Sequence, residues 1–171
     1  IDNHDVARFS YWAGERPKEK IKSALSYLFS IPGLPMLYYG TEIASPGAAP
    51  THEKTGEGQD YLNRRMMDWQ ALYGPDRDLV KYVAELTRIR KRHPCLSGDR
   101  LVEVYKDYGV YGYLRYDQRT AILVVLNNAG SVERRRLGLP RTAFHGGSFQ
   151  DLLTGKKYSL NRDSVDLRLA P

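Results

Sequence analysis

The stretch PGLPMLYYGTE, residues 32–42, decides the fold class of the first half of the chain. Its central run, Leu34–Gly40, is apolar without alternation and too short for a typical helix. Such a run is typical of a parallel-sheet strand that is covered on both faces. Pro17 opens the element before it, a helix predicted over residues 17–31. The apolar residues of that helix recur at helical spacing: Ile21, Ala24, Leu25, Leu28 and Phe29.

A second helix follows the strand after a long segment without periodicity, residues 44–60. Asp76 and Asp78 favour the start of this helix, and Pro94 ends the pattern, so we expect a helix over residues 76–92. The first half therefore alternates strands and helices, as α/β proteins do.

From Gly98 onward the pattern changes to short β-branched or aromatic runs separated by turn residues. These runs predict strands over residues 101–106, 110–116, 120–127, 132–137, 148–153 and 164–169. Several short strands at even spacing indicate an antiparallel β-sandwich. We therefore expect two domains, residues 1–96 and residues 97–171.

The α/β half holds too few elements to stand alone, because two βα units cannot close a sheet or cover both of its faces. The chain also starts with Ile1 and has neither an initiator Met nor a signal-peptide pattern. We therefore expect the sequence to be a piece of a longer protein. The open edge of such a part-barrel favours self-association.

Composition excludes several classes of protein. With 42% hydrophobic and 27% charged residues, the 171-residue chain has ordinary globular composition, and no apolar run approaches the roughly 20 residues of a membrane span. A single cysteine, Cys95, excludes an internal disulfide framework. The net charge of +6 comes from residues 76–171, which carry 18 Lys or Arg against 11 Asp or Glu. No nucleic-acid motif accompanies this charge, so neither a membrane nor nucleic acid is expected as a partner.

The tripeptide Asn3-His4-Asp5 places an imidazole beside a carboxylate directly after a predicted strand end. Taken alone it is a common turn or helix cap. The four histidines show no metal-ligand spacing, and the sequence contains neither a G-x-S-x-G elbow nor a phosphate-binding glycine loop.

Three segments together are more specific: NHDVARF (3–9), PGLPMLYYGTE (32–42) and GQDYLNRRMMDW (58–69). In order and spacing they resemble the last two barrel repeats of the α-amylase family of glycoside hydrolases. The third segment is most similar to the branch of neopullulanases, cyclomaltodextrinases and maltogenic amylases, although Tyr61 and Met66 replace two prolines of that pattern. Residues 151–155, DLLTG, resemble a turn of the family's C-terminal sandwich. The resemblance covers essentially the whole chain.

The resemblance implies the last two βα units of a (β/α)₈ TIM barrel followed by an antiparallel β-sandwich domain. Residues 1–5 would be the mouth end of the seventh strand and residues 34–39 the eighth strand. Active sites of such barrels lie at the C-terminal ends of the strands.

The function implied is cleavage of α-1,4, and alternatively α-1,6, glucosidic bonds with retention, on an α-glucan oligosaccharide or polysaccharide. The nucleophile and the acid/base would lie on barrel strands absent from this sequence, so the chain alone is expected to be inactive. Asp5 would be the catalytic carboxylate that stabilises the transition state. His4, Asp60 and Arg64 would bind substrate, and Arg8 would be the structural partner of a buried carboxylate. No cofactor is implied within the segment; calcium elsewhere in a parent enzyme and the compartment, cytoplasmic or secreted, stay open.

Three alternatives remain at this point. In the first, the chain is a non-catalytic glucan-binding or scaffold protein built from an amylase remnant. In the second, it is part of an amylase-like subunit that has lost catalysis. For Asp60 and Arg64, the alternative to sugar binding is a surface ion pair.

Overall fold

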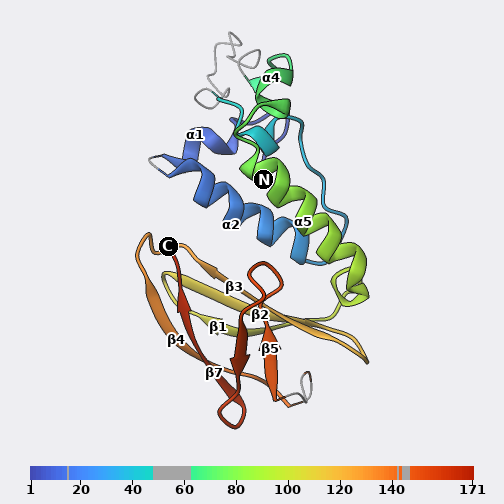
Figure 1. Ribbon diagram of the computed structural model, residues 1–171, viewed down its shortest axis with the longest axis vertical. Helices are drawn as coiled ribbons and strands as arrows, with labels where there is room; N and C mark the ends of the chain where they lie inside the picture. The colour runs from blue at the N-terminus through green and yellow to red at the C-terminus, as the bar shows by residue number, and fades with distance from the viewer. Residues whose placement is uncertain (15, 48–62, 142, 144–146) are drawn as a thin grey trace. The chain divides into compact units, whose positions relative to one another are not determined.

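The computed structural model describes residues 1–14, 16–47, 63–141, 143 and 147–171 (Figure 1). The chain divides into two compact units, residues 1–28 with 35–84 and residues 29–34 with 85–171. The two domains predicted from the change in sequence pattern, residues 1–96 and 97–171, stay a prediction. Within the described residues, no helix has both the length and the apolar character that a membrane span requires.

The regular elements before residue 97 are all helical in the described part of the chain. They are α1 (Phe9–Ala13), α2 (Pro17–Ser30), η1 (Thr41–Ile43), α4 (Trp69–Tyr73), α5 (Asp78–Arg92) and η2 (Pro94–Leu96). The two long helices match the predictions to within two residues at each end. The short helices α1 and α4 were not predicted. Asp68 precedes helix α4, and its side chain caps the helix by accepting a hydrogen bond from the Ala71 amide at 2.8 Å.

The predicted strand over residues 34–39 pairs with no other strand among the described residues. A strand is held by hydrogen bonds to its neighbours, and a barrel strand needs one neighbour on each side. The chain therefore shows the predicted helices of two βα units without the ladder that would make them part of a barrel. The barrel stays a proposal.

Within the first unit, helices α2 and α5 carry buried apolar residues, among them Ile21, Leu25 and Leu79. A hydroxyl pair adds a polar contact, because Ser26 Oγ lies 2.6 Å from Tyr82 Oη. Within the second unit, Arg90 Nη1 donates to the carbonyl oxygens of Phe29 at 2.7 Å and Ile31 at 3.2 Å. These bonds satisfy carbonyls that a helix end leaves without an intrahelical partner.

The second unit is antiparallel throughout its described strands, as predicted. Strands β1 (Leu101–Lys106), β2 (Val110–Tyr116) and β3 (Ala121–Asn127) form one sheet in that order. Two further pairs are β4 (Glu133–Gly138) with β7 (Ser164–Leu169), and β5 (Ser148–Gln150) with β6 (Lys157–Ser159). The sequence predicted a longer β5, over residues 148–153, and missed β6.

The turns between these strands form where the sequence places Asp residues. Asp107 Oδ1 accepts hydrogen bonds from the amides of Gly109 and Val110 at 2.9 and 2.7 Å. Asp151 starts the DLLTG turn, where its Oδ1 accepts from the Leu153 amide at 2.8 Å. Asp side chains that bond to the backbone two or three residues further on favour such turns.

The core of the second unit lies between the three-stranded sheet and the β4–β7 pair. Leu114 of β2, Leu137 of β4 and Val165 of β7 are its most deeply buried members. The predominance of antiparallel sheet agrees with the prediction for this part of the chain, and the β-sandwich stays a proposal.

Candidate functional site

Three of the four predicted site residues come together in the first unit. His4 and Asp5 occupy one turn, in which the Asp5 amide donates to Asn3 Oδ1 at 2.7 Å. Arg64, 59 residues further along the chain, donates through Nη2 to Asp5 Oδ1 at 3.3 Å and through Nε to the His4 carbonyl at 2.9 Å. His4 Nε2 lies 3.1 Å from Asp5 Oδ2. Asp60 lies outside the described residues.

The Asp5 carboxylate is open to solvent although it has two charged or chargeable neighbours. The side chains of His4 and Asp5 are 62% and 60% exposed, and that of Arg64 is 45% exposed. Ion pairs this exposed contribute little to folding stability. The cluster therefore presents acceptor oxygens, an imidazole and a guanidinium on one surface, a set that can hydrogen-bond neighbouring hydroxyl groups of a sugar.

Asp2 fixes the backbone that precedes the His4-Asp5 turn. Its side chain is buried, and its two oxygens accept hydrogen bonds from Thr41 Oγ1 at 2.8 Å and from the Phe9 amide at 3.2 Å. One carboxylate thus ties the residues before the His4-Asp5 turn to helix α1 and to η1. No local sequence signal distinguishes Asp2 from an exposed turn residue, and sequence analysis did not select it.

Arg8 is a packing residue, as the sequence predicted, but with different partners. Only 2% of it is exposed, and its guanidinium lies over the rings of Tyr38 and Tyr39, with centroid distances of 4.1 and 4.9 Å. Nη1 donates to the Tyr39 carbonyl at 2.6 Å. Among the described residues Arg8 therefore pairs with two aromatic rings and a carbonyl where the sequence predicted a buried carboxylate.

Tyr39 connects this packing to the segment that carries Arg64. Its hydroxyl donates to the Arg65 carbonyl at 2.7 Å. Tyr39 thereby positions the backbone next to Arg64. Burial, together with the neighbouring Tyr39, raises the pKa of Tyr38, so the Tyr38 phenol stays neutral near physiological pH.

The described residues contain no group of three His, Cys, Asp or Glu side chains arranged to hold a metal ion. His4, Asp5 and Arg64 offer hydrogen bonds and charge to a ligand.

The chain as a whole is similar in sequence and in structure to amylases and to a neopullulanase. No family model matches the chain. A β/α-amylase of Paenibacillus polymyxa is 29% identical over all of the chain and 14% of its own length. Neopullulanase 2 of Thermoactinomyces vulgaris is also 29% identical, over all of the chain and 27% of its own length. A crystal structure of an α-amylase from Geobacillus thermoleovorans with acarbose matches 99% of the chain and 36% of its own, at a TM-score of 0.82 and 29% identity. The chain thus spans about a third or less of the length of these proteins.

Proposed function

Because the chain belongs to the α-amylase family of glycoside hydrolases, we propose that it is the C-terminal part of a retaining enzyme that cleaves α-glucans. The bonds proposed are α-1,4 and, in the neopullulanase-like branch, α-1,6 glucosidic bonds. The observation that carries the proposal within this chain is the convergence of Arg64 on the exposed His4-Asp5 turn.

Asp5 is proposed as the carboxylate that stabilises the transition state. Retaining glycosidases use two further carboxyl groups, about 5–5.5 Å apart, as nucleophile and acid/base. A third carboxylate accelerates the reaction only if its hydrogen bonds to the sugar hydroxyls strengthen as the ring distorts. Asp5 suits this role because its carboxylate is exposed while its backbone amide is fixed by a hydrogen bond to Asn3 Oδ1.

Arg64 and His4 are proposed to hold the same sugar. Arg64 anchors the turn through the His4 carbonyl and pairs with the Asp5 carboxylate, whose side chain stays exposed. The imidazole of His4, 3.1 Å from Asp5, offers a donor or acceptor to a neighbouring hydroxyl. Asp60 stays proposed as a second sugar-binding carboxylate on the basis of the resemblance alone.

The experiment compares the parent enzyme with its Asp5→Asn variant on maltodextrin, cyclodextrin and pullulan. Asparagine keeps the shape and removes the charge, so kcat should fall by about 100-fold or more, the scale seen when a preorganised transition-state contact is lost. Asp163→Asn is the matched control, since Asp163 is an exposed carboxylate of the second unit that pairs with Arg141. Its activity should stay within about twofold, as surface changes normally do.

The rates on the three substrates assign the linkage, because pullulan turnover requires a site that accepts α-1,6-linked chains. If Asp5→Asn retains most of the activity, the proposed role of Asp5 is wrong. If the parent turns over none of the three substrates but binds them, the chain is part of a glucan-binding protein instead.

A further inference from the structure

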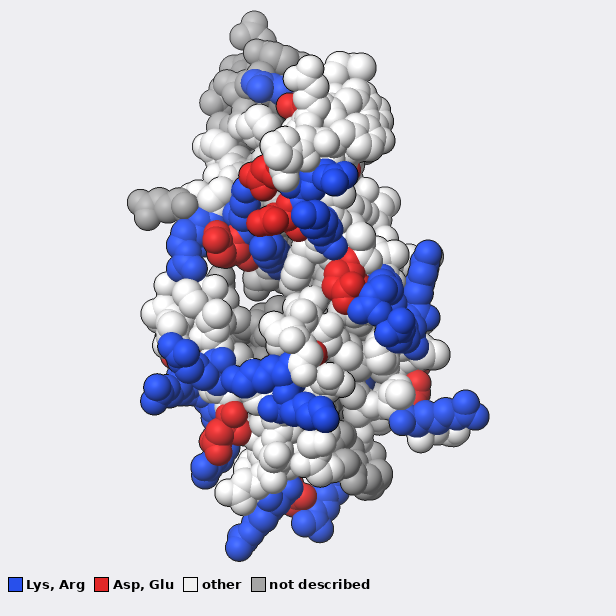
Figure 2. Space-filling view, viewed as in Figure 1, with Lys and Arg blue, Asp and Glu red and all other residues white. Residues whose placement is uncertain are grey.

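The outward face of the β4–β7 pair carries three arginines and one aspartate. Side chains alternate along a strand, and Leu137 and Val165 point into the core. The opposite, solvent side therefore holds Arg134, Arg136, Asp166 and Arg168. Figure 2 shows basic side chains gathered over this part of the second unit, with few acidic ones among them.

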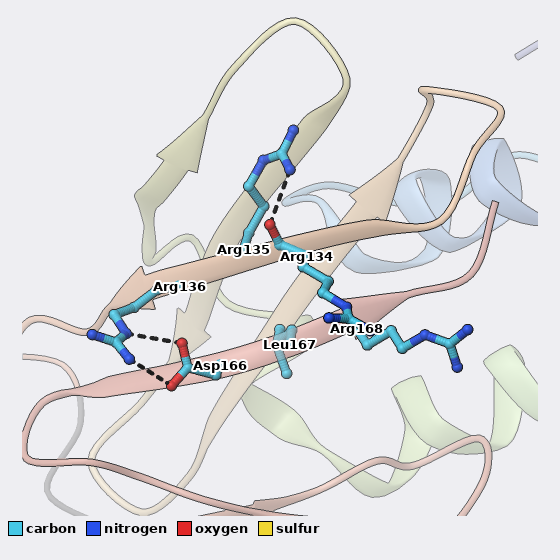
Figure 3. A pocket seen from close by; sticks show the side chains of 6 residues that line it. All are labelled: Arg134, Arg135, Arg136, Asp166, Leu167 and Arg168. Carbon is cyan, nitrogen blue, oxygen red and sulfur yellow. Dashed lines mark hydrogen bonds and ion pairs between the residues drawn. The ribbon is translucent and has the colours of Figure 1, made fainter.

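Only one of the three arginines on this face is neutralised. Arg136 lies directly opposite Asp166 and binds it with two hydrogen bonds, Nε to Oδ1 at 2.8 Å and Nη2 to Oδ2 at 3.0 Å. Figure 3 shows this pair joined by two dashed lines, while no line reaches the guanidinium of Arg134 or Arg168. Neither of these two side chains forms an ion pair with any residue that the structure describes.

Arg134 and Arg168 are also register partners, directly opposite each other on adjacent antiparallel strands. Like charges in such a position destabilise a sheet. Arg134 and Arg168 are thus an unfavourable pair, at a place where their two guanidinium groups can approach one ligand from both strands. Guanidinium forks match the oxygens of phosphate groups, with two parallel hydrogen bonds for each fork.

The surface is hollowed at this point. A pocket of about 320 Å³ is lined by Arg134, Arg135, Arg136, Asp166, Leu167 and Arg168. Pockets for small molecules start at roughly 300 Å³, so a phosphate carried by a sugar has room here. Arg135 is already engaged, since it pairs with Asp107 and Glu133, each at 2.7 Å.

We propose that Arg134 and Arg168 form a binding site for a phosphate dianion, either free or carried as a sugar phosphate. Two positive charges without an ion-pair partner among the described residues suit a phosphate group, which carries a charge of about −1.5 to −2 at pH 7. A carboxylate would neutralise only one of them. The site is built from the second unit alone and does not depend on the proposed glucan chemistry.

The test is an NMR titration of the full chain with inorganic phosphate at constant ionic strength, with chloride as the compensating ion. The arginine Nε–Hε signals of residues 134 and 168 should shift and saturate. Arg134→Gln and Arg168→Gln should each weaken binding by about tenfold, because a bidentate charged contact is lost. Arg119→Gln removes the same charge from an exposed turn between β2 and β3 and should leave the affinity unchanged.

Asp166→Asn should change the phosphate affinity in the opposite direction. It removes the ion-pair partner of Arg136, so phosphate should bind more tightly. A second titration with glucose 6-phosphate, and with glucose as its neutral control, separates the two sources of phosphate. Tighter binding of the sugar phosphate assigns the site to phosphorylated sugars, and equal binding assigns it to free phosphate. The proposal is overturned if the shifts do not saturate, if chloride produces the same shifts, or if Arg119→Gln weakens binding as much as the other two variants.

Discussion

Arg115 is expected to contribute more to the stability of the second unit than any exposed ion pair on its surface. The side chain is fully buried on β2 and has no carboxylate partner among the described residues. Its guanidinium donates to four backbone carbonyls: Arg100 at 3.0 Å, Cys95 at 3.0 Å, Gly98 at 2.7 Å and Ser30. Burial, and to a lesser extent Arg90, lowers the pKa of Arg115, yet an arginine stays charged at neutral pH.

The free-energy cost of removing the Arg115 guanidinium depends on the carbonyls that accept its hydrogen bonds. Ser30 and Cys95 are 7% and 1% exposed, so water hardly reaches their carbonyls when the donor is lost. An unsatisfied buried acceptor costs about 1–3 kcal/mol, so two of them cost roughly 2–6 kcal/mol. The variant also no longer buries a charged guanidinium, and this gain offsets part of the cost of the two unsatisfied carbonyls. We expect Arg115→Met to lower the free energy of unfolding by about 3–4 kcal/mol.

Hydrogen exchange at the β2 amides measures this change directly. The two tryptophans, Trp12 and Trp69, lie in the first unit, so their fluorescence does not report on the second. Arg115→Lys should recover part of the loss, because an ammonium keeps the charge but not the planar fork. Arg119→Met, at an exposed position, should change stability by less than about 0.5 kcal/mol. If Arg115→Met exchanges at the wild-type rate, the four bonds do not hold the unit together.

Three further predictions concern acid stability, backbone strain and activity. Hydrogen bonding from Arg135 lowers the pKa of Asp107 well below its ordinary value. The stability that the ionised Asp107 adds to the second unit is therefore complete above the ordinary carboxyl pKa near 4, and it is lost as the pH falls below that value. The urea midpoint of the second unit should therefore fall between pH 6 and pH 3, and Asp107→Asn should show a smaller fall; equal falls would contradict this. Gly40 has φ +84°, and an added Cβ would lie 2.4 Å from Ser45 Oγ, so Gly40→Ala should lower the tryptophan-detected stability of the first unit by about 1–3 kcal/mol. An unchanged midpoint would show that this turn accepts a side chain. The pure 171-residue chain should not release reducing sugar from starch, and inhibitor-sensitive turnover by it would overturn the proposed division of catalytic residues.

The sequence predicts best where the local chemistry alone determines the structure. Pro17 and Pro94 mark the two long helices because proline fits a first turn and cannot continue a helix. Asp107 and Asp151 mark turns because their carboxylates bond to nearby amides. These features depend on neighbours within a few residues, so the sequence displays them.

Features that depend on distant residues were missed or left open. Nothing near Arg115 in the sequence shows that its donors meet carbonyls 15 to 85 residues away, and its charge suggests the surface. Asp2 is similarly undistinguished until Thr41 reaches it. The contact of Arg64 with Asp5 was not predicted, because their sequence separation of 59 carries no spacing signal and the family resemblance implied only separate roles for them.

The most direct measurement of the central proposal is the intact mass of the parent gene product, with the sequence before Ile1 read by tandem mass spectrometry. The account predicts a few hundred further residues that contain an Asp and a Glu at the ends of two barrel strands, the pair that retaining hydrolysis requires. A gene product that starts at Ile1, or a longer one without that pair, would contradict it. In that case Asp5 would have no reaction to assist, and the His4–Asp5–Arg64 cluster would belong to a binding protein.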